Sequence, residues 1–162
     1  KYISNKDILD VEFVAKKVIE KESKKLYRFT RDRIKWHKEQ GHKIIFISGS
    51  PDFLVEKMSE KLGADLWFAS QYLNDGDKYS GEVIPMWDAD SKKKILEKLP
   101  FDLDNSYSYG DTTGDFTMLQ ITGYPTAINP NQKLLDKLKK EGVACNIVVE
   151  RKDVIYSIND IS

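Results

Sequence analysis

The chain has 162 residues, with 26 basic and 26 acidic side chains, 40% apolar residues and a single cysteine. This length suits one compact domain with or without a small appendage, and it allows a sizeable buried core. The balanced charge argues against a nucleic-acid partner, because neutralising phosphates requires a basic surplus. No apolar run approaches the roughly 20 residues that cross a bilayer, so no membrane association is expected. The lone cysteine allows no internal disulfide, and we expect a cytoplasmic protein.

An amphipathic helical segment opens the chain. Over residues 7–40, apolar side chains recur about every 3.5 positions, which predicts helix. A break near Ser23 or Thr30 would divide this segment into two helices. Lys and Glu fill the other face, which we interpret as a solvated face rather than a binding patch. His37 and His42 have a poor spacing for a shared metal, and we expect them at the surface.

Short strands and helices alternate after this segment. The uninterrupted apolar run over residues 44–47 is typical of a strand that is covered on both faces, as in a parallel sheet. A helix with Ser50 as its N-cap is predicted next. Residues 66–69 form another short strand, and the turn Asn74-Asp75-Gly76-Asp77 predicts a β-hairpin.

The second half of the chain continues this alternation. Further helices and strands are predicted at residues 91–99, 106–109, 126–128, 131–141 and 146–149. The pattern predicts an α/β fold with a Rossmann-like open parallel sheet flanked by helices. Ligands of such sheets bind at the carboxyl ends of the strands. Those ends carry Ser48-Gly49-Ser50, Gly110-Asp111 and Asn129.

The first of these strand ends offers a site for an anion. The Ser48 hydroxyl and the backbone N–H groups beside it lie at a strand-to-helix turn, where the helix dipole favours negative charge. An ordinary serine helix cap is the alternative interpretation. The absence of a G-x-S-x-G pattern argues against a serine-hydrolase nucleophile.

Carboxylates and a lysine follow further along the chain. Asp111 and Asp115 stand four residues apart, and hard oxygen ligands of this kind suit Mg²⁺, which takes only one or two protein carboxylates. A turn residue plus a helix cap is the structural alternative. Lys92 begins a run of three lysines, and an ammonium group near a phosphoryl group offsets its developing negative charge. A solvated helix face is the alternative for these lysines.

In this order and on these elements, the motifs resemble those of the haloacid dehalogenase superfamily of hydrolases, particularly its phosphoserine-phosphatase-like branch. The resemblance runs from about Lys25 to Val149. It rests on the segment Ile45-Phe46-Ile47-Ser48-Gly49-Ser50, on the GDxxxD signature over residues 110–115, and on the run from Tyr124 to Pro130. It implies that residues 1–24 are the end of a helical cap and that residues 25–162 form the α/β core.

The resemblance also implies roles for single residues. Ser48, with its neighbours Gly49 and Ser50, would bind the phosphate. Lys92 would neutralise the phosphoryl group, with Lys93 and Lys94 as open alternatives. Mg²⁺ would be bound by Asp111 directly, and by Asp115 directly or through water.

The first motif of the family is not found in the chain. In the family, a hydrophobic strand ending in Asp-x-Asp supplies the nucleophile and the acid/base, and no such strand precedes Ile44. The letters Asp102-Leu103-Asp104 match, but they follow Pro100 without an apolar strand, and we interpret them as a loop. The family places this strand between the strands that end here at Ser48 and Asp111. We therefore expect a longer chain or a separate piece to supply it.

The sequence thus predicts a Mg²⁺-dependent phosphomonoester hydrolase that acts on a small phosphorylated metabolite through an aspartyl-phosphate intermediate. The 162 residues alone are expected to be inactive by that route. Cap residues select the leaving group in the family, so neither the substrate nor the oligomeric state is predicted. A pseudo-enzyme that binds phosphate and Mg²⁺ without hydrolysis is the first alternative. A small-ligand sensor on a receiver-like sheet is the second.

Overall fold

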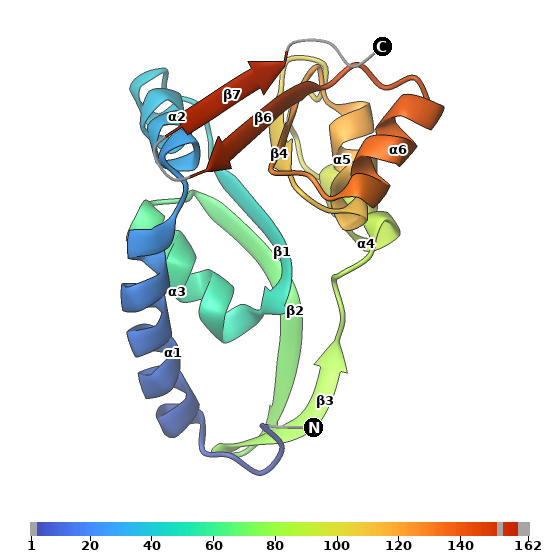
Figure 1. Ribbon diagram of the computed structural model, residues 1–162. Coiled ribbons are helices and arrows are strands. Elements are labelled where there is room, and N and C mark those ends of the chain that lie inside the picture. The colour runs from blue at the N-terminus through green and yellow to red at the C-terminus, as the bar shows by residue number, and fades with distance from the viewer. Residues whose placement is uncertain (1–2, 152–153, 159–162) are drawn as a thin grey trace. The chain divides into compact units, whose positions relative to one another are not determined.

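The computed structural model describes residues 3–151 and 154–158, and the chain divides into two compact units, Lys1–Trp87 and Asp88–Ser162 (Figure 1). Each unit contains its own sheet with helices packed against it. Among the described residues, no helix combines the length and the apolar character that crossing a membrane requires. The two units are described separately below.

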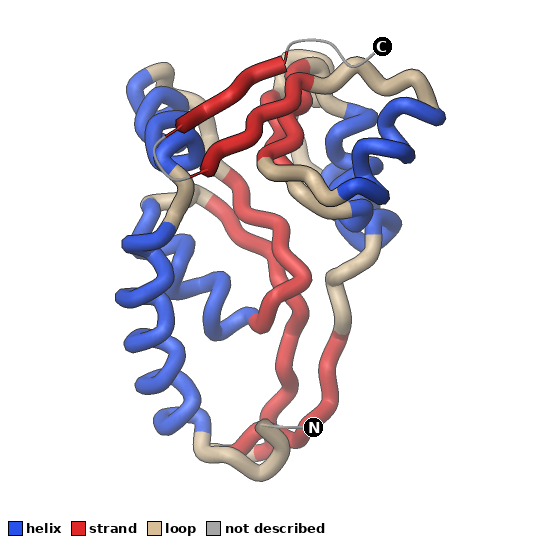
Figure 2. Tube along the Cα trace, viewed as in Figure 1, coloured by secondary structure: helices blue, strands red, loops and turns tan. Residues whose placement is uncertain are grey.

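The first unit contains a three-stranded sheet and its helices (Figure 2). Its elements are α1 (Ile8–Glu22), the 3₁₀ turn η1 (Ser23–Lys25), α2 (Arg28–Glu39), β1 (Ile45–Pro51), α3 (Asp52–Leu62), β2 (Leu66–Asp75) and β3 (Lys78–Ile84). β1 is parallel to β2, and β2 is antiparallel to β3. The predicted break in the long helical segment is confirmed at η1. α1 and α3 pack against each other, and α3 packs against β1 and β2.

Local signals explain the ends of several elements in this unit. Gly63 follows α3 with a φ of 69°, the left-handed conformation that glycine adopts without strain. Gly76 has a φ of 63° in the predicted hairpin turn between β2 and β3. The prediction of Ser50 as the N-cap of α3 was wrong: β1 continues to Pro51, which occupies the cap position, and α3 begins at Asp52.

One of the two histidines of the first unit is placed differently from the prediction. His37 is buried, with 8% of its surface exposed, whereas His42 is exposed as expected. Their Nδ1 atoms lie 2.9 Å apart, at hydrogen-bond distance. The Trp36 and His37 rings also pack in a T-shaped arrangement. The turn after α2 thus brings the two imidazole rings into contact. The spacing of the two histidines in the sequence does not predict this contact.

The second unit contains a four-stranded sheet with the strand order β4-β5-β6-β7. Its elements are α4 (Ala89–Leu96), β4 (Tyr107–Gly110), the 3₁₀ turn η2 (Thr113–Asp115), α5 (Phe116–Ile121), β5 (Tyr124–Ile128), α6 (Gln132–Lys140), β6 (Asn146–Arg151) and β7 (Val154–Ile158). β4, β5 and β6 are parallel, and β7 runs antiparallel to β6.

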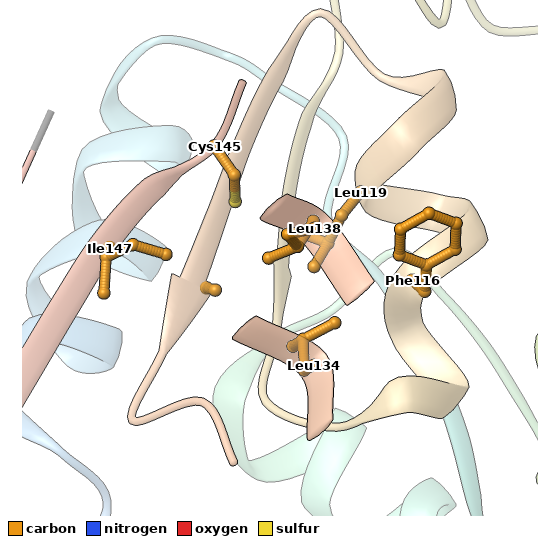
Figure 3. Packing of buried hydrophobic residues seen from close by; sticks show 7 residues of the cluster. Phe116, Leu119, Leu134, Leu138, Cys145 and Ile147 are labelled. Atoms are coloured by element: carbon orange, nitrogen blue, oxygen red, sulfur yellow. The ribbon is translucent and has the colours of Figure 1, made fainter. Parts of the chain in front are cut away.

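An apolar core holds the helices of the second unit against its sheet (Figure 3). Leu134 and Leu138 lie one turn apart on α6, and both are fully buried. They meet Leu119 of α5, which is also fully buried, and Ile147 of β6. Burying a leucine side chain contributes about 1.5–3 kcal/mol, so this cluster fixes α5 and α6 on the sheet. The carboxyl end of β4 is thereby held next to the start of α5.

The predicted fold class is confirmed, with parallel strands flanked by helices. The strands form two sheets, and within the described residues β1 pairs only with β2 and β4 only with β5. Each of the two strands that end in candidate site residues is therefore an edge strand. The division between the compact units lies after Trp87, and α1 belongs to the first unit. The assignment of residues 1–24 to a cap remains a prediction.

Candidate functional site

Ser48 lies in a bulge near the carboxyl end of β1. Ile47 pairs with Phe68 on β2, and the next registered pair is Pro51 with Ser70, so three residues of β1 stand opposite one residue of β2. A bulge of this kind interrupts the ladder and re-aims the side chains within it. Ser48 is half-buried, and its Oγ accepts a hydrogen bond of 3.1 Å from the Ser50 N–H. The Oγ–H proton of Ser48 then points away from Ser50.

Gly49 is the point of closest approach between this bulge and the segment after β3. A Cβ on Gly49 would lie 2.8 Å from the Cβ and 2.9 Å from the Cα of Trp87, closer than packed atoms approach. The Gly49 carbonyl accepts a 2.9 Å hydrogen bond from the buried Ser70 hydroxyl. Close packing against Trp87 therefore requires a glycine at position 49.

The second unit brings together the lysine and both carboxylates that the sequence selected. Lys92 is 7% exposed on α4, and its Nζ lies 2.5 Å from Oδ1 of Asp115. The neighbouring Lys93 and Lys94 are exposed. Of the three lysines, Lys92 is therefore the one that faces the GDxxxD segment within this unit. Its helix begins after Asp88, whose Oδ1 accepts a hydrogen bond from the Ser91 N–H.

Asp115 is the centre of this cluster, and it is 6% exposed. Its Oδ2 accepts hydrogen bonds from the backbone N–H groups of Asp111 at 3.0 Å and Thr112 at 3.2 Å. Burial acts to raise the pKa of Asp115, but the Lys92 ammonium and these N–H donors lower it by more. The result is a pKa below the ordinary value, and an ionised carboxylate. The Asp115 side chain fits here because residue 110 is a glycine. A Cβ at position 110 would lie 2.5 Å from the Asp115 Cβ, which is too close.

Asp111 presents the exposed carboxylate of the cluster, at the carboxyl end of β4. Partial desolvation raises its pKa, and the negative charge of Asp115 adds to that effect. Two carboxylates held this close repel each other, and a divalent cation relieves that repulsion. Oxygen donors of this kind fit Mg²⁺, with Asp111 as the accessible ligand. Both Asp115 oxygens already accept hydrogen bonds, which favours contact through water for this residue.

The loop after β5 supports the Asp111 end of the cluster. The Asn131 N–H donates to the Asp111 carbonyl at 3.0 Å. Asn129, two residues earlier, has a φ of 45°, an uncommon conformation for a residue with a side chain. Its side chain donates to the Glu150 carbonyl at 3.2 Å and accepts from the Glu150 N–H at 2.9 Å. Asn129 thus ties the loop to β6.

The segment Asp102-Leu103-Asp104 is a loop between α4 and β4, as predicted. Asp102 accepts hydrogen bonds from the Asn105 side chain at 2.7 Å and from the Asp104 N–H at 3.1 Å, which closes a local turn. Both aspartates are exposed. This pair therefore has the environment of a turn, not that of a nucleophile at the end of a buried strand.

Thr112 and Ser70 are site residues that the sequence analysis did not single out. Thr112 and Asp115 form a reciprocal capping box around η2, in which each side chain bonds the backbone of the other. The pattern T-x-x-D is the signal that predicts this device, and it was present in the sequence. No pattern distinguishes Ser70, because its role depends on contacts with distant residues.

Ser48, Gly49 and Ser50 belong to the first unit, and Lys92, Asp111 and Asp115 to the second. Residues 48–50 lie near the carboxyl end of β1 and Asp111 directly follows β4, as expected for ligand sites in this class of fold, whereas Lys92 lies on α4. The second unit thus places a buried ammonium group beside paired carboxylates.

The chain belongs to the haloacid dehalogenase-like hydrolase family, whose model matches residues 5–120. Within this superfamily it falls into the phosphoserine-phosphatase-like branch. It is 29% identical over 146 residues to a phosphoserine phosphatase of Methanocaldococcus jannaschii, covering 84% of this chain and 66% of that protein. It is 27% identical over 115 residues to a probable phosphatase of Mycobacterium tuberculosis, covering 68% of this chain and 40% of that protein.

Solved structures agree with this assignment. A phosphoserine phosphatase solved as an analogue of its phospho-aspartyl intermediate matches 93% of this chain and 68% of its own length, with a TM-score of 0.68 and 25% identity. A substrate-bound phosphoserine phosphatase matches 66% of this chain and 53% of its own, with a TM-score of 0.58 and 29% identity. The chain spans from 40% to 66% of the length of the two curated relatives described above.

Proposed function

We propose that the protein is a Mg²⁺-dependent phosphomonoester hydrolase acting on a small phosphorylated metabolite. The observation that carries this proposal is the cluster at the end of β4. There, the buried Lys92 and the buried Asp115 form an ion pair. Asp115 also accepts a hydrogen bond from the backbone N–H of the exposed Asp111. An ammonium group beside two carboxylates supports this proposal, because enzymes stabilise developing phosphoryl charge with preorganised charged groups.

In the proposed reaction, Asp111 would hold the metal ion directly, and Asp115 would hold it directly or through water. Bound Mg²⁺ would supply charge neutralisation to the phosphoryl oxygens. Lys92 balances the negative charge of the phosphoryl group while it remains bonded to Asp115. Because Lys92 is buried and held by that bond, its ammonium needs little reorganisation when substrate binds.

Ser48 and the neighbouring N–H groups would hold the non-bridging phosphate oxygens. The Ser48 Oγ accepts a hydrogen bond from Ser50, which leaves the hydroxyl proton to donate to an anion. Gly49 has no side chain, and the space that one would fill is occupied by Trp87, which packs against the backbone of the bulge.

The nucleophile of this route is the first aspartate of the Asp-x-Asp motif that ends a hydrophobic strand in the family, and no such strand precedes Ile44 in the sequence. The second aspartate of that motif would protonate the leaving alcohol. The proposed intermediate is an aspartyl phosphate, later hydrolysed by water. Within the described residues, β1 and β4 are each an edge strand of their own sheet, and an edge strand can accept a further strand. The chain alone is then inactive.

A catalytically inactive protein that binds phosphate and Mg²⁺ is the second candidate. The observation that favours it is the environment of Asp102 and Asp104, the one Asp-x-Asp-x-Ser sequence in the chain, which forms an exposed turn. A binder of this kind would use the same Ser48 and Asp111 without turning over its ligand.

The test is hydrolysis of a chromogenic phosphomonoester and of phosphoserine by the full-length protein with Mg²⁺. Phosphoserine is included because phosphoserine phosphatases are among the relatives described above. Asp111→Asn should lower turnover at least about a hundredfold, as expected when a group that acts in the transition state is removed. Asp104→Asn is the matched control and should retain full turnover. Phosphate binding without hydrolysis of any ester would instead support the binder, and unchanged turnover of Asp111→Asn would contradict the metal assignment.

A further inference from the structure

A chain of hydrogen bonds in the first unit ends at the candidate phosphate-binding hydroxyl. The Met86 N–H donates to Ser70 Oγ at 2.9 Å, and Ser70 Oγ–H donates to the Gly49 carbonyl at 2.9 Å. The Ser50 N–H, on the same peptide group as that carbonyl, donates to Ser48 Oγ at 3.1 Å. Ser70 is 0% exposed, so bulk water does not compete for its hydroxyl.

The geometry of a trans peptide explains how Ser70 reaches Ser48. The carbonyl of Gly49 and the N–H of Ser50 belong to one planar group and point in opposite directions. When Ser70 holds the carbonyl, the N–H is turned to the other side, where the Ser48 Oγ accepts it. The Ser48 oxygen then has one lone pair occupied, and its proton is left to donate elsewhere.

The strand ladder does not fix this peptide, which makes the Ser70 contact more important. Between the registered pairs Ile47–Phe68 and Pro51–Ser70, the β1–β2 pairing is interrupted at residues 48–50. The peptide between Gly49 and Ser50 is therefore oriented by the Ser70 side chain and by close packing against Trp87. Hydrogen bonds in such a series also polarise one another, so the last donor is strengthened by the first.

We infer that Ser70 is a positioning residue for phosphate binding: through the peptide between Gly49 and Ser50, it sets the orientation of the Ser48 hydroxyl. This inference rests on the proposed function, because it takes Ser48 to be a phosphate ligand. Ser70 lies on β2, 22 positions after Ser48, and we assign it no direct contact with the substrate. The Met86 N–H holds the Ser70 hydroxyl in place.

The test is a double-mutant cycle on affinity for inorganic phosphate, measured by isothermal titration calorimetry on the full-length protein. Ser48→Ala should lower the affinity for phosphate about tenfold or more, because a hydrogen bond to a charged group contributes that much binding free energy. Ser70→Ala should weaken it about threefold to tenfold, and it should have no further effect in the Ser48→Ala background. A merely structural role for Ser70 would lower affinity by the same factor in both backgrounds.

Ser59→Ala is the matched control, because Ser59 is a serine of the same unit that is only 3% exposed and lies on α3, outside the bulge. It should leave phosphate affinity unchanged. If Ser70→Ala does not fold by circular dichroism, Ser70→Cys replaces it, and its weaker hydrogen bonds should give a smaller loss that again vanishes with Ser48→Ala.

The two proposals fail in different ways. Unchanged phosphate affinity in Ser48→Ala overturns the phosphate site itself. A clear loss in Ser48→Ala, combined with no loss in the Ser70 variant or with equal losses in both backgrounds, overturns only the role of Ser70.

Discussion

The Nζ atom of Lys92 lies 2.5 Å from Oδ1 of Asp115, and each side chain is only 9% exposed. Their neighbours on the same helix provide a contrast. Lys93 lies 3.7 Å from Glu97, and that pair is about half exposed. The buried pair holds one end of Asp115, and the backbone N–H groups of Asp111 and Thr112 hold the other. The carboxylate thereby connects α4 to the end of β4.

The first prediction concerns this ion pair. Lys92→Met and Asp115→Asn should each lower the free energy of unfolding by about 3 kcal/mol, because each leaves a buried group without its partner. The double variant should lose less than the sum of the two single losses. Urea unfolding followed by circular dichroism measures all three values.

Lys93→Met is the control for losing a lysine from α4. It should unfold at nearly the wild-type urea concentration, since an exposed pair contributes little. Equal losses for Lys92→Met and Lys93→Met would contradict the importance given to burial.

The second prediction concerns the space that Gly110 leaves for Asp115. In Gly110→Ala, the new Cβ would lie 2.5 Å from the Asp115 Cβ and 2.8 Å from its Cγ, so the carboxylate must move. Unfolding free energy should fall by about 2 kcal/mol, as for other overpacked sites. Affinity for Mn²⁺, used in place of Mg²⁺ and followed by electron paramagnetic resonance, should fall by at least about tenfold because the ligands are displaced.

Gly142→Ala separates these two effects. Gly142 has a φ of 64° and nothing within 4 Å of an added Cβ, so alanine there brings backbone strain alone. It should lose about 1 kcal/mol of stability and keep the wild-type Mn²⁺ affinity. Retention of Mn²⁺ affinity in Gly110→Ala would show that the carboxylates do not need this close packing.

The fold was predictable where its signals are local. The apolar run at residues 44–47, the turn around Gly76 and the glycine at position 63 each fix a short segment through its own conformational preferences, and all three lie where expected. The sequence left the choice among Lys92, Lys93 and Lys94 open, and burial of Lys92 alone among the three distinguishes it in the structure. Its role toward phosphate stays a prediction.

Features that depend on tertiary contacts were not predictable in this way. Ser50 has the composition of a helix cap, but the bulge in β1 carries the strand past it to Pro51. His37 looked like a surface residue because nothing in its neighbourhood indicates that it folds against His42. Ser70 has no sequence signal at all, because its partners Gly49 and Met86 are 21 and 16 residues away.

The third prediction concerns Asn129, which combines a φ of 45° with two side-chain bonds to the backbone of Glu150. Asn129→Ala loses both bonds and keeps the unfavourable backbone, so it should lower unfolding free energy by about 2–3 kcal/mol. Asn129→Gly loses the same bonds but tolerates the left-handed backbone, and it should be more stable than the alanine variant by about 1 kcal/mol. Urea unfolding of the two variants side by side measures this difference, and equal stabilities would show that the backbone carries no strain there.

The fourth prediction concerns the pH dependence of stability that His37 contributes. Burial lowers the pKa of His37 from its ordinary value of 6.5 to about 4, and the positive charges of Arg33 and His42 add to the effect. Between pH 4 and 6.5, the unfolded chain therefore binds a proton that the folded chain excludes at this site. Stability should rise with pH across this window and level off above it. After allowance for solvent screening, the rise should be about 1–2 kcal/mol.

His37→Asn isolates this contribution, because asparagine keeps a polar group near the position of Nδ1 but does not titrate. Urea unfolding at pH 4.5, 5.5, 6.5 and 7.5 gives the slope for each protein. The variant should show a flatter dependence between pH 4.5 and 6.5 than the wild type, and a parallel dependence between 6.5 and 7.5. Identical slopes below pH 6.5 would mean that His37 takes up its proton in the folded state as readily as in the unfolded chain, which its burial against Trp36 and His42 argues against.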